Sequence, residues 1–184
     1  AEYAVVSESE KNLIFSKLFK KNEFQKFISV SSMLAGYKLS KKDIVVALGK
    51  TLGENSNSDW HSDAFYPIIK GFIYLVDIGE NDAPFQILKR TSSINFLSKF
   101  YDYSSIHSKL GSPRISTKEQ LSDIKNKKIE SHIGLKGSSM IANTSALHRK
   151  GKHLSDKERF MITFEFRRLR LHRRFFRSFK FMEL

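Results

Sequence analysis

The chain has 184 residues, of which 40% are hydrophobic and 12% aromatic, a composition typical of one folded domain with a sizeable core. It contains no cysteine, which excludes disulfides, zinc–thiolate sites and cysteine nucleophiles and favours a reducing compartment, so we expect a cytoplasmic protein. The formal net charge is +13, and residues 167–184 carry +6 of it, through six arginines and one lysine against one glutamate.

The first part of the chain is predicted to be helical. Ser7 and Glu10 have the spacing of a capping box, in which each side chain satisfies a free amide at the start of a helix. Apolar residues then recur at helical spacing, and further helices are predicted over 23–34 and over 40–52. We expect residues 1–53 to form a helical support that packs against the outer face of a sheet.

Strand patterns dominate the middle of the chain. The sequence 79–82 has the residues of a tight turn and suits a hairpin. Residues 92–131 interrupt the strand pattern with two short helical stretches, and an excursion of this length inside a β fold is usually functional or mobile. The predicted strands cover residues 60–63, 71–78, 84–88, 131–135, 139–143 and 159–166.

His61 and Asp63 are the strongest candidates for metal ligands. Residues two apart in a strand point to the same side, so these two offer an imidazole and a carboxylate from one face. A second imidazole, for which we take His148, would complete the two-histidine, one-carboxylate triad of non-haem Fe(II) oxygenases. The alternative is two unrelated polar residues at a strand end. Surface or packing roles are expected for His107, His132, His153 and His172.

A cation follows the proposed distal ligand. Arg159 lies eleven residues after His148 and begins the strand-like run 159–166. A guanidinium at this point could bind the distal carboxylate of a 2-oxo acid through a bidentate pair, which a lysine would do less selectively. Arg159 therefore supports the assignment of His61 and Asp63 to an oxygenase site.

Several segments follow one another in the order of a known family. They resemble the phytanoyl-CoA dioxygenase-like family, whose members are Fe(II)- and 2-oxoglutarate-dependent oxygenases on a double-stranded β-helix. The resemblance implies that the metal binds His61, Asp63 and His148 and that 2-oxoglutarate binds Arg159. The segments are Trp60-His-Ser-Asp63, Gly71-Phe-Ile-Tyr-Leu-Val-Asp77, Glu80-Asn-Asp-Ala-Pro-Phe-Gln86, Leu147-His-Arg-Lys-Gly151 and Arg159.

The same resemblance implies a mainly β architecture. It consists of a double-stranded β-helix, or jelly roll, with the N-terminal helices packed on its outer sheet and residues 92–131 forming a helical lid over the active site. One oxygenase domain would then span 1–184, with its β-helix core at 59–166 and a basic C-terminal segment at 167–184. The chain departs from the family at Lys150, where a small residue is common. Further pocket candidates are Tyr66, Tyr74, Gln86 and Thr144, and we assign Tyr74 and Thr144 to cosubstrate binding.

The leading hypothesis is a dioxygenase that consumes O₂ and 2-oxoglutarate, hydroxylates a small organic substrate and releases succinate and CO₂. Asp63 favours hydroxylation, because related halogenases have a small residue in its place. One alternative is an AlkB-like nucleic-acid demethylase, since the run 159–165 loosely matches that family's arginine pattern. Another is a non-enzymatic β-helix scaffold that binds polyanions. Residues 167–184 could contact an anionic membrane or nucleic acid, or form a terminal helix docked on the sheet.

Overall fold

The structure is a computed structural model that describes residues 2–18, 21–36, 38–51, 58–64, 67–93, 122 and 124–166. Most of the predicted lid, the basic C-terminal segment, and Tyr66, His107 and His172 lie outside the described residues. The described helices are α1 (Glu8–Leu18), α2 (Lys21–Ala35) and the short 3-10 helix η1 (Lys41–Asp43). The described strands are β1 (Glu2–Val5), β2 (Ile44–Thr51), β3 (Ile69–Tyr74), β4 (Phe85–Leu88), β5 (Ile129–His132), β6 (Ser139–Asn143), β7 (His148–Lys150) and β8 (Arg159–Phe166).

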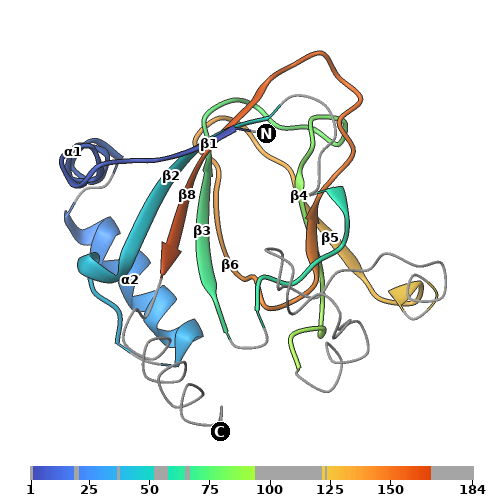
Figure 1. Ribbon diagram of the computed structural model, residues 1–184, viewed down its shortest axis with the longest axis horizontal. Coiled ribbons are helices and arrows are strands. Elements are labelled where there is room, and N and C mark those ends of the chain that lie inside the picture. Colours follow the sequence, from blue (N-terminus) through green and yellow to red (C-terminus); the bar gives the residue numbers. More distant parts are fainter. Residues whose placement is uncertain are drawn as a thin grey trace, which may run out of the picture.

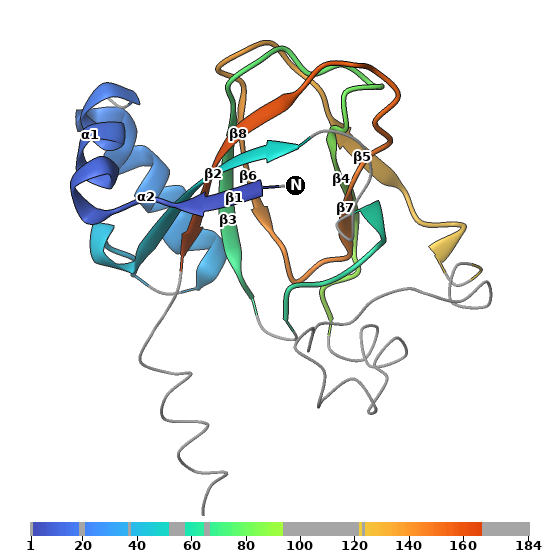
Figure 2. The same cartoon turned by 45° about the horizontal axis from the view of Figure 1, so that its top comes forward.

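The strands form two antiparallel sheets that face each other, as in a jelly roll (Figure 1). The larger sheet has the strand order β1-β2-β8-β3-β6, and the smaller one has the order β5-β4-β7. Both helices lie on the outer face of the larger sheet, on the side away from the smaller sheet (Figure 2). The prediction of a mainly β fold with N-terminal helices on an outer sheet is confirmed. No described helix is long and apolar enough to cross a membrane.

The outer face of the larger sheet is an aromatic layer beneath the helices. Alternate residues of β8, namely Ile162, Phe164 and Phe166, are buried in one cluster with Phe15 of α1. The ring of Phe27 in α2 lies 5.5 Å from the rings of both Phe164 and Phe166, measured between centroids. These contacts fix α2 against the sheet, because aromatic pairs at this separation add to the free energy of burial.

Gly71 lets α2 come this close. A Cβ atom built at Gly71 would lie 2.7 Å from the ring of Phe27, well inside van der Waals contact. A side chain at this position of β3 would force the Phe27 ring or α2 to shift, so the glycine permits the close approach of helix to sheet.

The inner face of the larger sheet carries a second cluster and several polar groups. The rings of Phe72 in β3 and Phe85 in β4 lie 4.9 Å apart and join the two sheets. Since residues two apart share a face of a strand, Arg159 and Glu165 of β8 also point to this inner side. The space between the sheets is therefore where charged side chains can meet. The buried apolar residues of this cluster are Phe72, Tyr74, Ile78, Phe85 and Met161.

Two helices are confirmed and a third prediction is wrong. The Ser7 capping box is present, with the Ser7 amide donating to Glu10 Oε2 at 2.7 Å, and α2 extends the helix predicted over 23–34. In contrast, the described part of the helix predicted over 40–52 contains no α-helix. A capping box at Ser40 is present, but it caps only η1, and β2 follows at once. The β-branched residues at the start of β2 favour a strand, and its pairing with β8 stabilises it.

The hairpin predicted around residues 79–82 is also wrong. A turn is present, with the Asp82 amide donating to the Gly79 carbonyl, but the flanking β3 and β4 belong to different sheets. Ile78 instead forms a bridge with Gly134, and Asp82 forms one with His153. The turn therefore connects the two layers, which local turn chemistry cannot distinguish from a hairpin.

Candidate metal centre

The two predicted histidine ligands are joined through their backbones. His61 and His148 form an isolated antiparallel bridge, with the His61 amide donating to the His148 carbonyl at 3.0 Å and the reverse bond at 2.8 Å. Side chains of directly opposed residues lie on the same face. Their imidazole centroids are accordingly 4.4 Å apart, although the two residues are 87 positions apart in the chain.

Both imidazoles are oriented in the same way. Nδ1 of His61 lies 2.8 Å from the carbonyl of Asp59, and Nδ1 of His148 lies 2.9 Å from the carbonyl of Ala146. Because a carbonyl only accepts hydrogen bonds, Nδ1 must be the protonated nitrogen in each ring. The neutral ring then has its lone pair on Nε2, as metal-binding histidines with a backbone partner do.

Asp63 brings a carboxylate to the same point. Its amide donates to the Thr144 carbonyl at 3.0 Å, which extends the bridge between the two segments. Oδ2 of Asp63 lies 3.8 Å from Nε2 of His148. Burial alone would raise the pKa of the Asp63 carboxyl, but the nearby Lys70 and His148 lower it to about 2. Asp63 is therefore ionised at neutral pH.

The three side chains fit a divalent transition metal. One ligand atom from each of His61, Asp63 and His148 lies within 4.8 Å of the other two, and both histidines are buried. Burial lowers the pKa of His148 to about 4, despite the nearby Asp63 carboxylate, so its ring is neutral at pH 7. Bonds of about 2.1 Å place neighbouring ligands roughly 3 Å apart, so small side-chain movements would close the site. Two imidazoles and one carboxylate on one side leave the other positions open.

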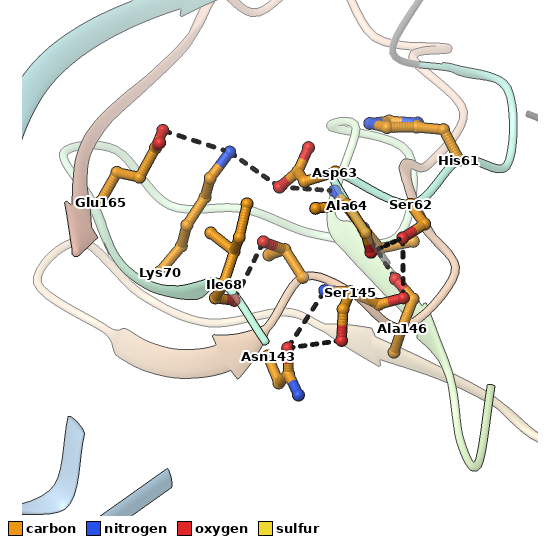
Figure 3. Close-up of polar contacts among 12 residues, drawn as sticks. His61, Ser62, Asp63, Ala64, Ile68, Lys70, Asn143, Ser145, Ala146 and Glu165 are labelled. Carbon is orange, nitrogen blue, oxygen red and sulfur yellow. Dashed lines mark hydrogen bonds and ion pairs between the residues drawn. The ribbon is translucent and has the colours of Figure 1, made fainter. Parts of the chain in front are cut away.

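A lysine that the sequence analysis missed touches this site. Nζ of Lys70 lies 2.8 Å from Oδ2 of Asp63 and 3.5 Å from Oε2 of Glu165 (Figure 3). Burial would lower the pKa of Lys70, but the two carboxylates raise it above its usual value. Lys70 interrupts an otherwise apolar strand at an inward position, a signal that strand alternation could have revealed.

Arg159 lies inside, at the opposite end of the shared strand face from Lys70. It is only 3% exposed, and its guanidinium carbon is 5.8 Å from the centre of the Tyr74 ring. One guanidinium nitrogen lies 2.9 Å from the sulfur of Met161. In the register of the sheet, Tyr74 of β3 is opposite Met161 of β8, and Lys70 is opposite Glu165. Arg159 and Lys70 are thus separated along the interior.

The remaining predicted pocket residues occupy different environments. The Tyr74 hydroxyl donates to the His132 carbonyl and accepts from the Phe85 amide, so its only proton is already hydrogen-bonded to the backbone. The Thr144 hydroxyl donates to the Ile68 carbonyl at 3.2 Å. Cosubstrate binding by Tyr74 or Thr144 stays a prediction.

Gln86 does not face the metal centre. Phe85 and Ile87 lie on the side of β4 that meets His148, and the residue between them points to the other face. There Gln86 accepts a hydrogen bond from Arg149 and donates one to Ser131. The suggestion that Gln86 lines the pocket is therefore wrong, because its side chain lies on the opposite face of β4 from Phe85 and Ile87.

Lys150, the departure from the family pattern, is buried on the same side of β7 as His148. His132 lies in β5, as expected, and the His153 ring donates to the Lys157 carbonyl in the loop before β8. Neither ring belongs to the group of described side chains that could hold a metal, and the surface or packing role of both stays a prediction.

No protein-family model matches the chain, and no curated protein matches it. Solved structures do. The epimerase SnoN, crystallised with Fe³⁺, α-ketoglutarate and nogalamycin RO, superposes with a TM-score of 0.56 at 11% identity, covering 89% of this chain and 61% of that chain. EvdO2 from Micromonospora carbonacea var. aurantiaca, complexed with 2-oxoglutarate, gives 0.55 at 11% identity over 89% and 66%.

EctD from S. alaskensis, crystallised with 2-oxoglutarate and 5-hydroxyectoine, gives a TM-score of 0.52 at 10% identity over 89% of this chain and 71% of that chain. At these identities the likeness shows a shared jelly-roll fold. The chain spans less than two thirds of the length of the SnoN and EvdO2 chains.

Proposed function

We propose that this chain is an Fe(II)- and 2-oxoglutarate-dependent oxygenase that hydroxylates a small organic substrate. The observation that carries the proposal is the convergence of His61, Asp63 and His148, with both imidazoles oriented by backbone carbonyls. We further propose that the two sheets form a double-stranded β-helix, that one oxygenase domain spans 1–184, and that the chain is related to the phytanoyl-CoA dioxygenase-like family. Structures with this fold that contain iron or 2-oxoglutarate support the choice of metal and cosubstrate.

Each protein group has a defined task in this proposal. Bound iron would supply the reaction of O₂ with 2-oxoglutarate that gives succinate and CO₂ and oxidises the substrate. His61 and His148 would hold the metal through Nε2, with their Nδ1 protons fixed by carbonyls that resist ring rotation. Asp63 would contribute the one carboxylate ligand, which the nearby Lys70 keeps ionised.

Arg159 would bind the far carboxylate of 2-oxoglutarate. Its burial on the inner face of β8 strengthens a charge-assisted pair, because little water competes for the guanidinium. Tyr74 would hold the guanidinium against the face of its ring. Thr144 would bind the cosubstrate beside Asp63, whose amide donates to the Thr144 carbonyl. Hydroxylation is the favoured outcome, since Asp63 retains the carboxylate ligand.

The test is anaerobic titration of metal-free protein with Fe(II) and then 2-oxoglutarate. A visible charge-transfer absorption should appear only when both are present, and admission of O₂ should yield succinate. The variants His61→Gln and His148→Gln should abolish the absorption, whereas His153→Gln should keep it. A wild-type protein that folds yet gives neither the absorption nor succinate would contradict the proposal.

A further inference from the structure

The Lys70 ammonium lies between two acids of the barrel interior. Lys70 in β3 pairs directly with Glu165 in β8, so both side chains leave the larger sheet on its inner face. Asp63 arrives from the segment before β3 and meets the same ammonium (Figure 3). The side chains of Lys70, Asp63 and Glu165 are 18%, 19% and 20% exposed, so water screens this group only partly.

This arrangement places a second carboxylate close to the candidate metal centre. Oδ2 of Asp63 and Oε2 of Glu165 contact one ammonium at 2.8 and 3.5 Å, so they can be no farther apart than the sum of these distances, 6.3 Å. Two carboxylates binding one metal need oxygens roughly 3 Å apart, which a rotation of the long Glu165 side chain could provide. Without a cation between them, both acids would be attracted to the same metal.

We propose that Lys70 is a positioning residue that reserves the metal for Asp63 and holds Glu165 outside the coordination shell. The ammonium contacts Oε2 of Glu165 and Oδ2 of Asp63, the oxygen that lies 3.8 Å from Nε2 of His148. The metal would therefore share Oδ2 with the ammonium or bind the other oxygen of Asp63. The metal would then keep positions open for exchangeable ligands. This inference rests on the proposed function, since it concerns ligands of the same metal.

The sign of the effect separates this role from a purely structural ion pair. If Lys70 only supported the fold, its removal would loosen the site and weaken metal binding. If Lys70 keeps Glu165 out of the coordination shell, its removal eliminates a positive charge near the metal and allows Glu165 to become a further ligand. Metal binding then becomes tighter while the binding of 2-oxoglutarate becomes weaker, because an open position is lost.

The experiment compares Lys70→Met with Lys70→Arg, which keeps the charge, in the full chain. Co(II) affinity is measured by calorimetry, the Co(II) visible spectrum reports coordination, and 2-oxoglutarate is titrated into the Co(II)-loaded protein. Lys70→Met should bind Co(II) about tenfold or more tightly, show a changed spectrum and bind 2-oxoglutarate at least about tenfold more weakly, in the range of known effects of outer-shell residues. Lys70→Arg should resemble the wild type.

Glu165→Gln supplies the second test and covers the case in which Lys70→Met does not fold. Alone, Glu165→Gln should leave the Co(II) spectrum unchanged, because Glu165 is outside the shell while Lys70 is present. In the double variant Lys70→Met/Glu165→Gln, 2-oxoglutarate affinity should return to near the wild-type value. Weaker Co(II) binding by folded Lys70→Met, or an altered spectrum in Glu165→Gln, would overturn the inference. A wild type that binds no Co(II) would instead overturn the proposed function.

Discussion

At the scale of single residues, the candidate centre is organised by hydrogen bonds that orient ligands before any metal arrives. Each histidine donates Nδ1–H to a carbonyl two residues earlier in the chain, at Asp59 for His61 and at Ala146 for His148. Rings held in this way lose little rotational freedom when they bind, so the affinity for metal should be high. A histidine without this orientation would not substitute for them.

Replacement of either histidine should therefore remove most of the metal affinity. His148→Gln is expected to weaken Co(II) binding at least about a hundredfold, since a direct ligand matters more than the outer-shell residues that already cost 10–100-fold. Calorimetric titration of metal-free protein measures the effect. His153→Gln is the matched control, because His153 donates to Lys157 in a loop away from the triad. Equal loss in both variants would show that the triad is not the binding site.

Arg159 predicts a separate effect on the cosubstrate. Arg159→Met should raise the concentration of 2-oxoglutarate that half-saturates succinate production by about a hundredfold, and it should leave Co(II) affinity nearly unchanged. A buried charge-assisted bidentate pair is lost, while the metal ligands remain. Arg149→Met is the control, since Arg149 lies over Trp60 on the other face of β7. An unaltered half-saturation value would remove Arg159 from the site.

His148 also predicts how the stability of the metal-free protein depends on pH. Its pKa falls from the ordinary 6.5 to about 4 in the folded chain, so between these values the unfolded chain binds more protons. Stability should consequently fall as the pH drops from 7 to 5, by about 2 kcal/mol from this group. Urea unfolding at the two pH values measures the loss, and His148→Gln should show a smaller one. A loss of the same size in His148→Gln would assign the effect elsewhere.

At the scale of secondary structure elements, local patterns predicted some strands to the residue and failed on others. The strands over 139–143 and 159–166 appear with those bounds, although only the second has an apolar residue at every other position. In 40–52 a correct capping signal led to a wrong helix, since pairing with β8 decides that segment. The short strand β7 has no pattern of its own and forms only where β4 meets it.

The candidate site was predictable for a different reason. Chemistry and spacing predict His61 and Asp63, the resemblance to a known oxygenase family implies His148 as well, and the fold brings the three together. The interaction of Lys70 with Asp63 and Glu165 could not be deduced in this way, because it depends on the register between β3 and β8. Register is set by the whole sheet rather than by any local motif.

The close contact of α2 with β3 gives a prediction about stability. Gly71→Ala places a methyl group 2.7 Å from the Phe27 ring, so the helix or the ring must move. Overpacking of this kind costs about 1–3 kcal/mol of unfolding free energy. Urea unfolding of Gly71→Ala, Phe27→Leu and the double variant measures the coupling. The double variant should be more stable than the sum of the single losses predicts, and strict additivity would mean that the two side chains do not collide.

At the scale of the whole molecule, the positive charge is concentrated in residues 167–184, outside the described residues. The prediction that this segment docks as a helix on the sheet therefore remains to be tested. A variant ending at Phe166 should unfold at lower urea concentration than the full chain and keep its succinate production per folded molecule. Binding of the full chain to anionic vesicles or DNA that weakens steeply with salt, and is absent from the shortened variant, would favour a polyanion contact instead.

The bridge between His61 and His148 also bears on how the chain folds. It joins residues that are 87 positions apart, and contacts between such distant residues form late because chain entropy opposes the closure of the loop. The two helices and the Ser7 capping box, in contrast, need only local contacts. A folding intermediate that contains α1 and α2 would thus have no means to bind metal. Metal binding therefore indicates that folding is complete. When Co(II) is added during refolding, the protein should bind it only in the last kinetic phase.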